Sequence, residues 1–80
     1  MSRTLRSPRH EALRVFLVER RKRAGLTQSE VARRLHRYQS YVANVETGQK
    51  RIDVVEFVAF AEAIGFDPAK AISKIASVKS

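Results

Sequence analysis

The sequence of 80 residues contains no cysteine, and this absence excludes three kinds of protein. Without thiols the chain forms no disulfide scaffold, no thiolate zinc site and no cysteine nucleophile. Long hydrophobic runs are lacking too: the longest, residues 57–61, has five residues, whereas a membrane-spanning helix needs about 20. Residues 1–6 carry charge, but no apolar core follows them, so they do not resemble a signal peptide. We therefore expect a cytoplasmic protein with no membrane partner.

Constellations typical of catalysis or metal binding are also missing from the sequence. It has no glycine-rich phosphate loop and no clustered pair of acids, and Ser29 and Ser40 offer the ingredients of nucleophilic catalysis in name alone. His10 and His36 lie far apart and have no carboxylate companions at the spacing of metal ligands. We therefore expect no enzymatic activity, no cofactor and no bound metal.

Basic residues are abundant, and their distribution is uneven. The chain has 16 Lys and Arg against 8 Asp and Glu, a net charge of +8. Residues 1–40 hold eleven basic and three acidic residues, whereas residues 41–80 hold five of each. The whole excess therefore belongs to the first half, which indicates a surface for an anionic partner.

The length and the apolar content predict one small folded domain. Domains typically contain about 50–200 residues, and the 44% of apolar residues is too high for a disordered basic tail. Strand-like alternation, internal repeats and low-complexity segments are absent. We expect a folded domain over residues 8–77, a flexible basic arm at residues 1–7 and a loose C-terminus at residues 78–80.

Start and stop signals divide the chain into five short helices. Serine, threonine or aspartate N-caps mark the starts, two of them inside a capping box. Proline at the first helical position supports two of the starts, and glycine marks the ends. The starts are Ser7 with Pro8, Thr27 with Glu30, Asp53 with Glu56, and Asp67 with Pro68; the stops are Gly25, Gly48 and Gly65. Residues 39–46 form the third helix. The sequence therefore predicts an all-α fold, a compact five-helix bundle.

Apolar residues at three- and four-residue steps predict which helix faces meet in the core. These expected core positions are Leu13, Phe16, Leu17, Ala24, Val31, Ala32, Leu35, Val42, Val45, Val54, Phe57, Ala61 and Ile64. On the fourth helix this assignment leaves Val55, Val58 and Ala59 unexplained. A helix that is apolar nearly all round is buried on more than one side. Either the fifth helix or Phe16 covers these residues, or they form a dimer or partner surface together with helix five.

Residues 28–47 predict a helix-turn-helix formed by the second and third helices. Ala32 is small where the two helices would cross, and Val42 and Val45 turn one face of the third helix inward. The remaining residues of that helix must then face outward: Gln39, Ser40, Tyr41, Ala43 and Asn44. Amide and hydroxyl groups dominate this outward set, and such groups are suited to reading the edges of bases.

Over residues 10–68 the chain resembles the Cro/Xre-type helix-turn-helix regulators, which have the lambda-repressor-like fold. The residues that carry the resemblance are Leu17, Arg21, Gly25, Leu26, Thr27, Gln28, Val31, Ala32, Leu35, Gln39, Ser40, Val42, Glu46, Gly48, Ile64 and Gly65. Two positions depart from the family pattern. His36 replaces the usual glycine of the turn, and Tyr38 replaces the common Ser or Thr N-cap.

The resemblance implies binding to double-stranded DNA, with the third helix in the major groove. By residue, it places Gln39, Ser40, Tyr41 and Asn44 at base-reading positions, and Gln28, Lys50 and Arg51 at phosphate contacts. It also implies a structural pair between Arg21 and Glu46. Arg33, Arg34 and Arg37 near the turn are further phosphate candidates, and Arg3, Arg6 and Arg9 suggest a groove-reaching arm.

From these features we expect a nucleoid-associated transcriptional regulator, a repressor that reads a palindromic operator as a homodimer. The dimer would form through helix four and helix five. The alternative is an antitoxin or adaptor whose main role is binding a partner protein such as a toxin, with autoregulatory DNA binding. A chain of 80 residues leaves no room for a sensor domain, so regulation would come through concentration, oligomerisation or a partner.

Overall fold

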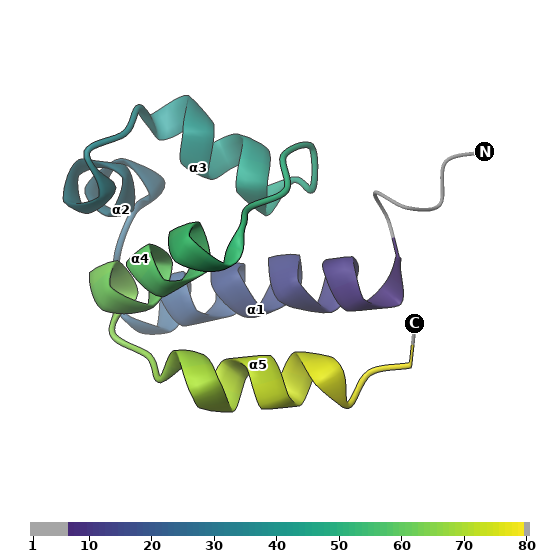
Figure 1. The fold of residues 1–80 in the computed structure, drawn as a ribbon. Coiled ribbons are helices and arrows are strands. Elements are labelled where there is room, and N and C mark those ends of the chain that lie inside the picture. The colour runs from purple at the N-terminus through teal and green to yellow at the C-terminus, as the bar shows by residue number, and fades with distance from the viewer. Residues whose placement is uncertain (1–6, 80) are drawn as a thin grey trace.

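A computed structural model describes residues 7–79 and contains five α-helices in this part of the chain. They are α1 (Pro8–Arg23), α2 (Gln28–Leu35), α3 (Gln39–Glu46), α4 (Val54–Ile64) and α5 (Pro68–Ala76), shown in Figure 1. Strands are absent from the described residues, so the all-α prediction is confirmed. Within residues 7–79, none of the helices is both long enough and apolar enough to cross a membrane.

Local capping explains where the helices begin. The Ser7 hydroxyl accepts from the His10 amide at 3.1 Å, and Pro8 then begins α1. Thr27 and Asp53 each cap a helix in a complete capping box, because the side chain of the third helical residue, a glutamate, also reaches back to the cap amide. Asp67 caps α5. The predicted helix starts are therefore confirmed.

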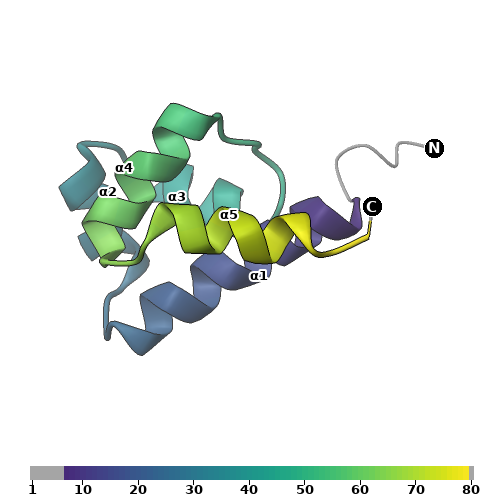
Figure 2. The same cartoon turned by 60° about the horizontal axis from the view of Figure 1, so that its bottom comes forward.

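The core lies between α1, α4 and the α2–α3 pair. Leu17, Val31, Val42 and Phe60 are fully buried there. Figure 1 shows α2 and α3 on one side of α1 and α4, with α5 on the other side, and Figure 2 shows α5 crossing over α1. Phe66, in the α4–α5 connection, packs edge-on against Phe16 with ring centroids 4.9 Å apart. Phe66 therefore holds the α4–α5 connection against α1.

Two expected core residues lie at the surface. Ala24 is exposed because it is the C-cap of α1, beyond the last packed turn. Val54 is 67% exposed because α4 turns Phe57 and Phe60 inward, which leaves its first residue beside solvent. Both predictions were wrong. In each case a residue at the end of a helix shares the apolar spacing but lies beyond its packing partner.

Arg9 fastens the end of α5 to the beginning of α1. Its Nε donates to the Val78 carbonyl at 2.8 Å, and its Nη2 donates to the Ala76 carbonyl at 3.1 Å. A cation at these terminal carbonyls suits the negative end of a helix. Arg9 therefore belongs to the folded domain and not to the expected arm, whose residues Arg3 and Arg6 lie outside the described residues. Val78, expected to be loose, is half-buried.

Candidate nucleic-acid interface

The turn between α2 and α3 is tight, and His36 adopts its left-handed conformation. The backbone of His36 has φ 59° and ψ 42°. The next amide, of Arg37, donates to the Ala32 carbonyl at 2.9 Å and closes the end of α2. The two helices pack closely after this turn, and Val31 of α2 and Val42 of α3 are both completely buried. The helix-turn-helix therefore forms although the usual glycine is missing.

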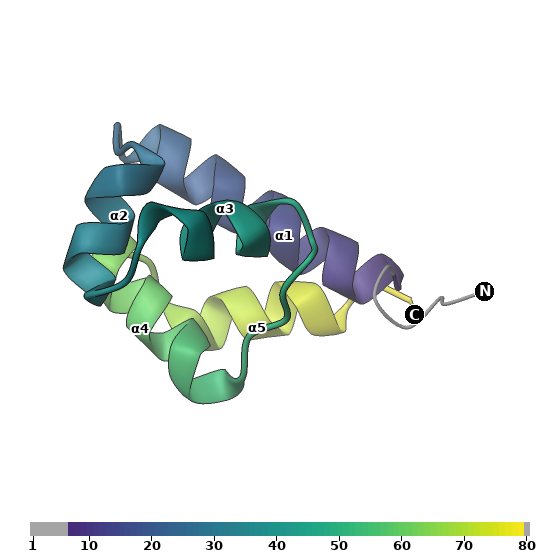
Figure 3. The ribbon, with the colours of Figure 1, turned by 90° about the horizontal axis from the view of Figure 1, so that it is seen from above.

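The outward face of α3 lies at the surface of this motif. Gln39, Ser40 and Asn44 are exposed, as expected from the burial of Val42 and Val45 on the opposite face. Figure 3 shows α3 uncovered when the molecule is viewed from above. We call Gln39, Ser40 and Asn44 the polar strip. These side chains carry both hydrogen-bond donors and acceptors and no charge.

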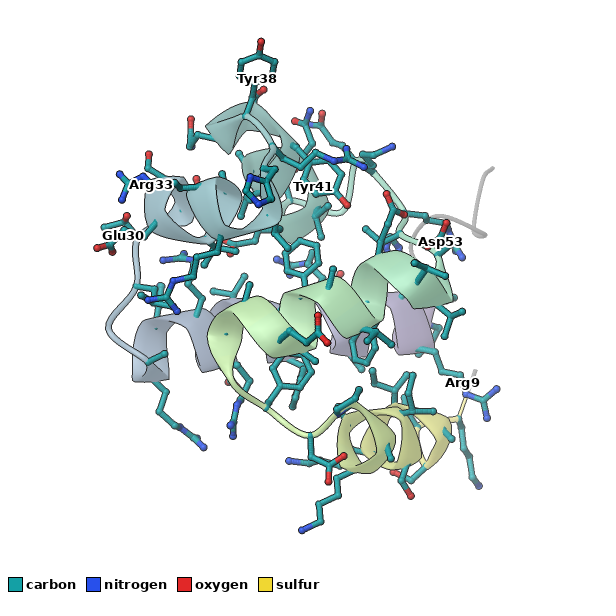
Figure 4. All side chains as sticks on the ribbon, turned by 60° about the vertical axis from the view of Figure 1, so that its left-hand side comes forward. Arg9, Glu30, Arg33, Tyr38, Tyr41 and Asp53 are labelled. Carbon is teal, nitrogen blue, oxygen red and sulfur yellow. The ribbon has the colours of Figure 1, made fainter. Side chains whose placement is uncertain are left out.

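Tyr38, just before the polar strip, is a surface residue that the sequence reasoning missed. It is 86% exposed, and it caps α3 without a side-chain hydrogen bond. Figure 4 shows its ring pointing away from the rest of the molecule. Its exposure could have been predicted from its place at the N-cap of a helix, where an aromatic ring has nothing to pack against.

Tyr41 differs from the other base-reading candidates because it turns toward α4. Its ring stacks on Phe60 with centroids 6.0 Å apart, and its hydroxyl donates to Glu56 Oε2 at 3.1 Å. The guanidinium of Arg37 lies 4.1 Å above the same ring and 3.4 Å from that carboxylate. Burial, and then the hydrogen bond to Glu56, raises the pKa of Tyr41 to about 12. Both the ring and the hydroxyl of Tyr41 thus help to hold α3 to α4.

A bidentate ion pair fixes the other end of α3 to α1. Arg21 Nε and Nη2 donate to the two carboxylate oxygens of Glu46 at 2.6 and 3.0 Å, and both side chains are nearly buried. The hydrogen bonds to Glu46 raise the pKa of Arg21. Arg14 adds a bond to the backbone carbonyl of Glu46 at 2.9 Å. The two residues that the resemblance implies as a structural pair are therefore in direct contact.

The Gln28 side chain connects this ion pair to the polar strip. Its Nε2 donates to Glu46 Oε1 at 2.8 Å, and its Oε1 accepts from Gln39 Nε2 at 2.6 Å. Gln28 is the first residue of α2, and Gln39 is the first residue of α3. The sequence pattern assigned these two glutamines to separate contacts, whereas the structure joins them in one chain of hydrogen bonds that also contains Arg21 and Glu46.

The basic candidates near the motif fall into two groups. Arg33 on α2, and Lys50 and Arg51 after α3, are exposed. Arg34 and Arg37 are engaged within the chain: Arg34 Nη1 donates to the Ala63 carbonyl at 2.8 Å, and Arg37 pairs with a carboxylate of α4. Figure 4 shows Arg33 on the outer side of α2. The exposed cations therefore lie on elements that flank α3.

Known proteins are similar to this chain in both fold and sequence. Residues 12–71 match the family model of a helix-turn-helix domain. An XRE-family like protein from Pseudomonas syringae pv. tomato str. DC3000 is 43% identical, with a TM-score of 0.86, over 94% of this chain and 92% of that one. The clp gene regulator ClgR from C. glutamicum is 25% identical, with a TM-score of 0.76, over 85% and 88% of the chains. No curated protein matches. The chain belongs to the Xre-type helix-turn-helix family of DNA-binding transcriptional regulators.

Proposed function

We propose that this regulator binds one duplex sequence through α3, which lies in the major groove, and that it represses transcription there. The observation that carries the proposal is the uncharged polar strip on α3, flanked by exposed cations on α2 and after α3. Cations supply affinity for phosphates whatever the sequence, whereas uncharged amides and hydroxyls distinguish base edges. Occupancy of a promoter by a small protein blocks polymerase without any further activity.

The residues divide between reading and holding. Gln39, Ser40 and Asn44 read base edges, and the exposed part of Tyr41 contacts an adjacent base or phosphate. Tyr38 extends the surface that reaches the groove wall. The phosphate contacts come from the N-terminus of α2, from the turn and from the loop after α3: Gln28, Arg33, Arg37, Lys50 and Arg51. Arg37 can move from Glu56 to a phosphate because its side chain is 46% exposed.

A second copy of the chain completes the proposed reader. Val55 on α4 and Ile72 on α5 are 73% and 45% exposed, and Val54 and Val58 extend the apolar surface on α4. Pairing through these helices relates two copies of α3 by a two-fold axis. The operator is then a near-palindrome, with half-sites about 34 Å apart, one turn of B-DNA.

Titration of labelled duplexes at several salt concentrations tests the proposal. Binding through phosphates predicts an affinity that falls steeply with salt. The logarithm of the association constant should fall against the logarithm of the salt concentration with a slope of about −0.9 for each phosphate contact. Gln39→Ala relaxes the preference at one base pair of each half-site, whereas the control Gln49→Ala, in the loop after α3, leaves every preference unchanged. A salt-independent affinity contradicts the phosphate contacts, and uniform weakening by Gln39→Ala makes that residue a positioning contact. Transcription from a promoter that carries the bound site distinguishes repression from activation.

A further inference from the structure

The direction of the hydrogen bonds that run from Arg21 to Gln39 is fixed at Glu46, the member that contacts Gln28. A carboxylate accepts hydrogen bonds and cannot donate them, and Arg21 donates and cannot accept. The Glu46 carboxylate receives two bonds from Arg21 and a third from Gln28. Because the Glu46 side chain is only 7% exposed, water does not replace these donors. Gln28 must therefore turn its amide nitrogen toward Glu46.

This constraint passes to the next side chain. With its nitrogen on Glu46, Gln28 presents its amide oxygen to Gln39, at 2.6 Å from the Gln39 nitrogen. The reversed amide of Gln39 would bring two oxygens together and would lose the bond. Gln39 therefore uses one N–H on Gln28. Its oxygen and its second N–H remain for an outside partner, one acceptor beside one donor.

We infer that Glu46 sets the base preference of Gln39, acting through Gln28. An acceptor beside a donor matches adenine, which offers N6–H and N7, and does not match guanine, which offers two acceptors at O6 and N7. A reversed Gln39 amide would present two N–H groups and would favour guanine. Glu46 is thus a positioning residue that never touches the DNA. The inference rests on the proposed base reading by Gln39.

The experiment begins with the preferred duplex, selected from a random pool by the unaltered protein. The position at which Gln39→Ala loses its preference is then synthesised as A·T and as G·C, and both dissociation constants are measured. We expect the unaltered protein to prefer adenine about tenfold. Glu46→Gln lowers this ratio to about twofold or less, because an amide at position 46 offers Gln28 either a donor or an acceptor.

A second variant leaves the buried ion pair intact. Gln28→Leu removes the connecting amide and keeps Arg21 with Glu46, so the ratio also falls to about twofold, although overall affinity falls as well. In the Gln28→Leu background, Glu46→Gln produces no further change in the ratio. The matched control is Glu30→Gln in the capping box of α2, where either residue type serves; it keeps the tenfold ratio.

The outcomes separate this inference from the function on which it rests. Circular dichroism checks that each variant is folded. If Glu46→Gln unfolds, the ratio of A·T to G·C affinity in Gln28→Leu tests the inference alone. A tenfold adenine preference retained in the folded Gln28→Leu variant overturns the inference and leaves base reading by Gln39 in place. If Gln39→Ala alters the preference at no position, the proposed base reading itself fails, and the inference fails with it.

Discussion

At the scale of single residues, Tyr41 joins the third helix to the fourth with both its ring and its hydroxyl. The ring lies on Phe60, and the hydroxyl donates to Glu56. Deprotonation would place a phenolate against that carboxylate, so the folded state favours the neutral phenol. The orientation of the polar strip therefore depends on a group that titrates at alkaline pH.

This coupling predicts a pH-dependent stability. Folding raises the pKa of Tyr41 from 10.0 to about 12. Its contribution is therefore complete below pH 10 and is lost as the pH rises toward 12, because the unfolded chain releases the proton first. We expect Tyr41→Phe to flatten the fall in the free energy of unfolding over this interval. Urea denaturation at several alkaline pH values measures it.

The control is Tyr38→Phe, which removes an exposed hydroxyl at the cap of α3. It keeps the slope of the unaltered protein. Equal slopes for the unaltered protein and for Tyr41→Phe would show that Tyr41 titrates alike in the folded and unfolded chains.

The residue assignments also show what the sequence can predict about the site. Exposure of Gln39, Ser40 and Asn44 follows from helical periodicity once Val42 and Val45 are taken as buried. The contacts of Tyr41 with Phe60 and Glu56 could not be predicted, because nothing in the sequence around Tyr41 indicates which residues of α4 lie beside it. The bond from Gln28 to Gln39 was missed for the same reason: it depends on the angle between two helices.

At the scale of elements, the α2–α3 turn retains a conformation that its sequence does not favour. A residue other than glycine in the left-handed region costs roughly 1–2 kcal/mol. His36 adopts this region with φ 59°. The surrounding contacts outweigh the cost, because the turn is closed by the bond from Arg37 to Ala32 and by burial of Val31 and Val42.

Glycine at this position should therefore stabilise the domain. His36→Gly relieves the left-handed strain and adds some freedom to the unfolded chain, for a net gain of about 1 kcal/mol. In a domain of this size the gain raises Tm by roughly 4–8 °C. Thermal unfolding followed by circular dichroism measures it. His36→Ala is the control, since it removes the imidazole and keeps the strain. A similar gain for both variants would mean that the imidazole, and not the backbone, is the source of the cost.

The elements also show why helix ends were predicted better than helix faces. The starts depend on contacts three residues apart, as in the capping boxes of Thr27 and Asp53, so the sequence carries the whole signal. The faces depend on the rotation of a helix against distant partners. On α4 that rotation buries Phe57, Phe60, Ala61, Ala63 and Ile64. Val54 shares their apolar character and lies outside.

At the scale of the whole molecule, the proposed DNA surface and the proposed pairing surface are separate. Figures 1 and 4 place α3 and α5 on opposite sides of the described chain. A second copy seated on α5 and on the exposed valines of α4 would therefore leave α3 uncovered. The uneven charge agrees with this division, because the excess of +8 belongs to residues 1–40 and the remaining half is neutral.

If two copies of the chain pair through α4 and α5, a single charged substitution in that surface should convert the dimer to a monomer. Val55→Glu places a carboxylate on the apolar surface of α4, where desolvation in an interface is costly. Sedimentation analysis should give a dimer for the unaltered chain and a monomer for Val55→Glu. Ser29→Glu, the same side chain placed on α2, remains a dimer. A monomer for the unaltered chain would contradict pairing and would leave the apolar surface to a partner protein, as in the antitoxin alternative.

The central claim is that α3 reads a specific duplex sequence, and selection from a random duplex pool tests it most directly. The unaltered protein should enrich a near-palindrome whose half-sites lie about one helical turn apart, with an adenine at the position that becomes unselective in Gln39→Ala. A pool that stays unenriched after repeated rounds, while the protein still binds DNA in a salt-dependent way, would contradict the claim and leave a non-specific DNA-binding protein.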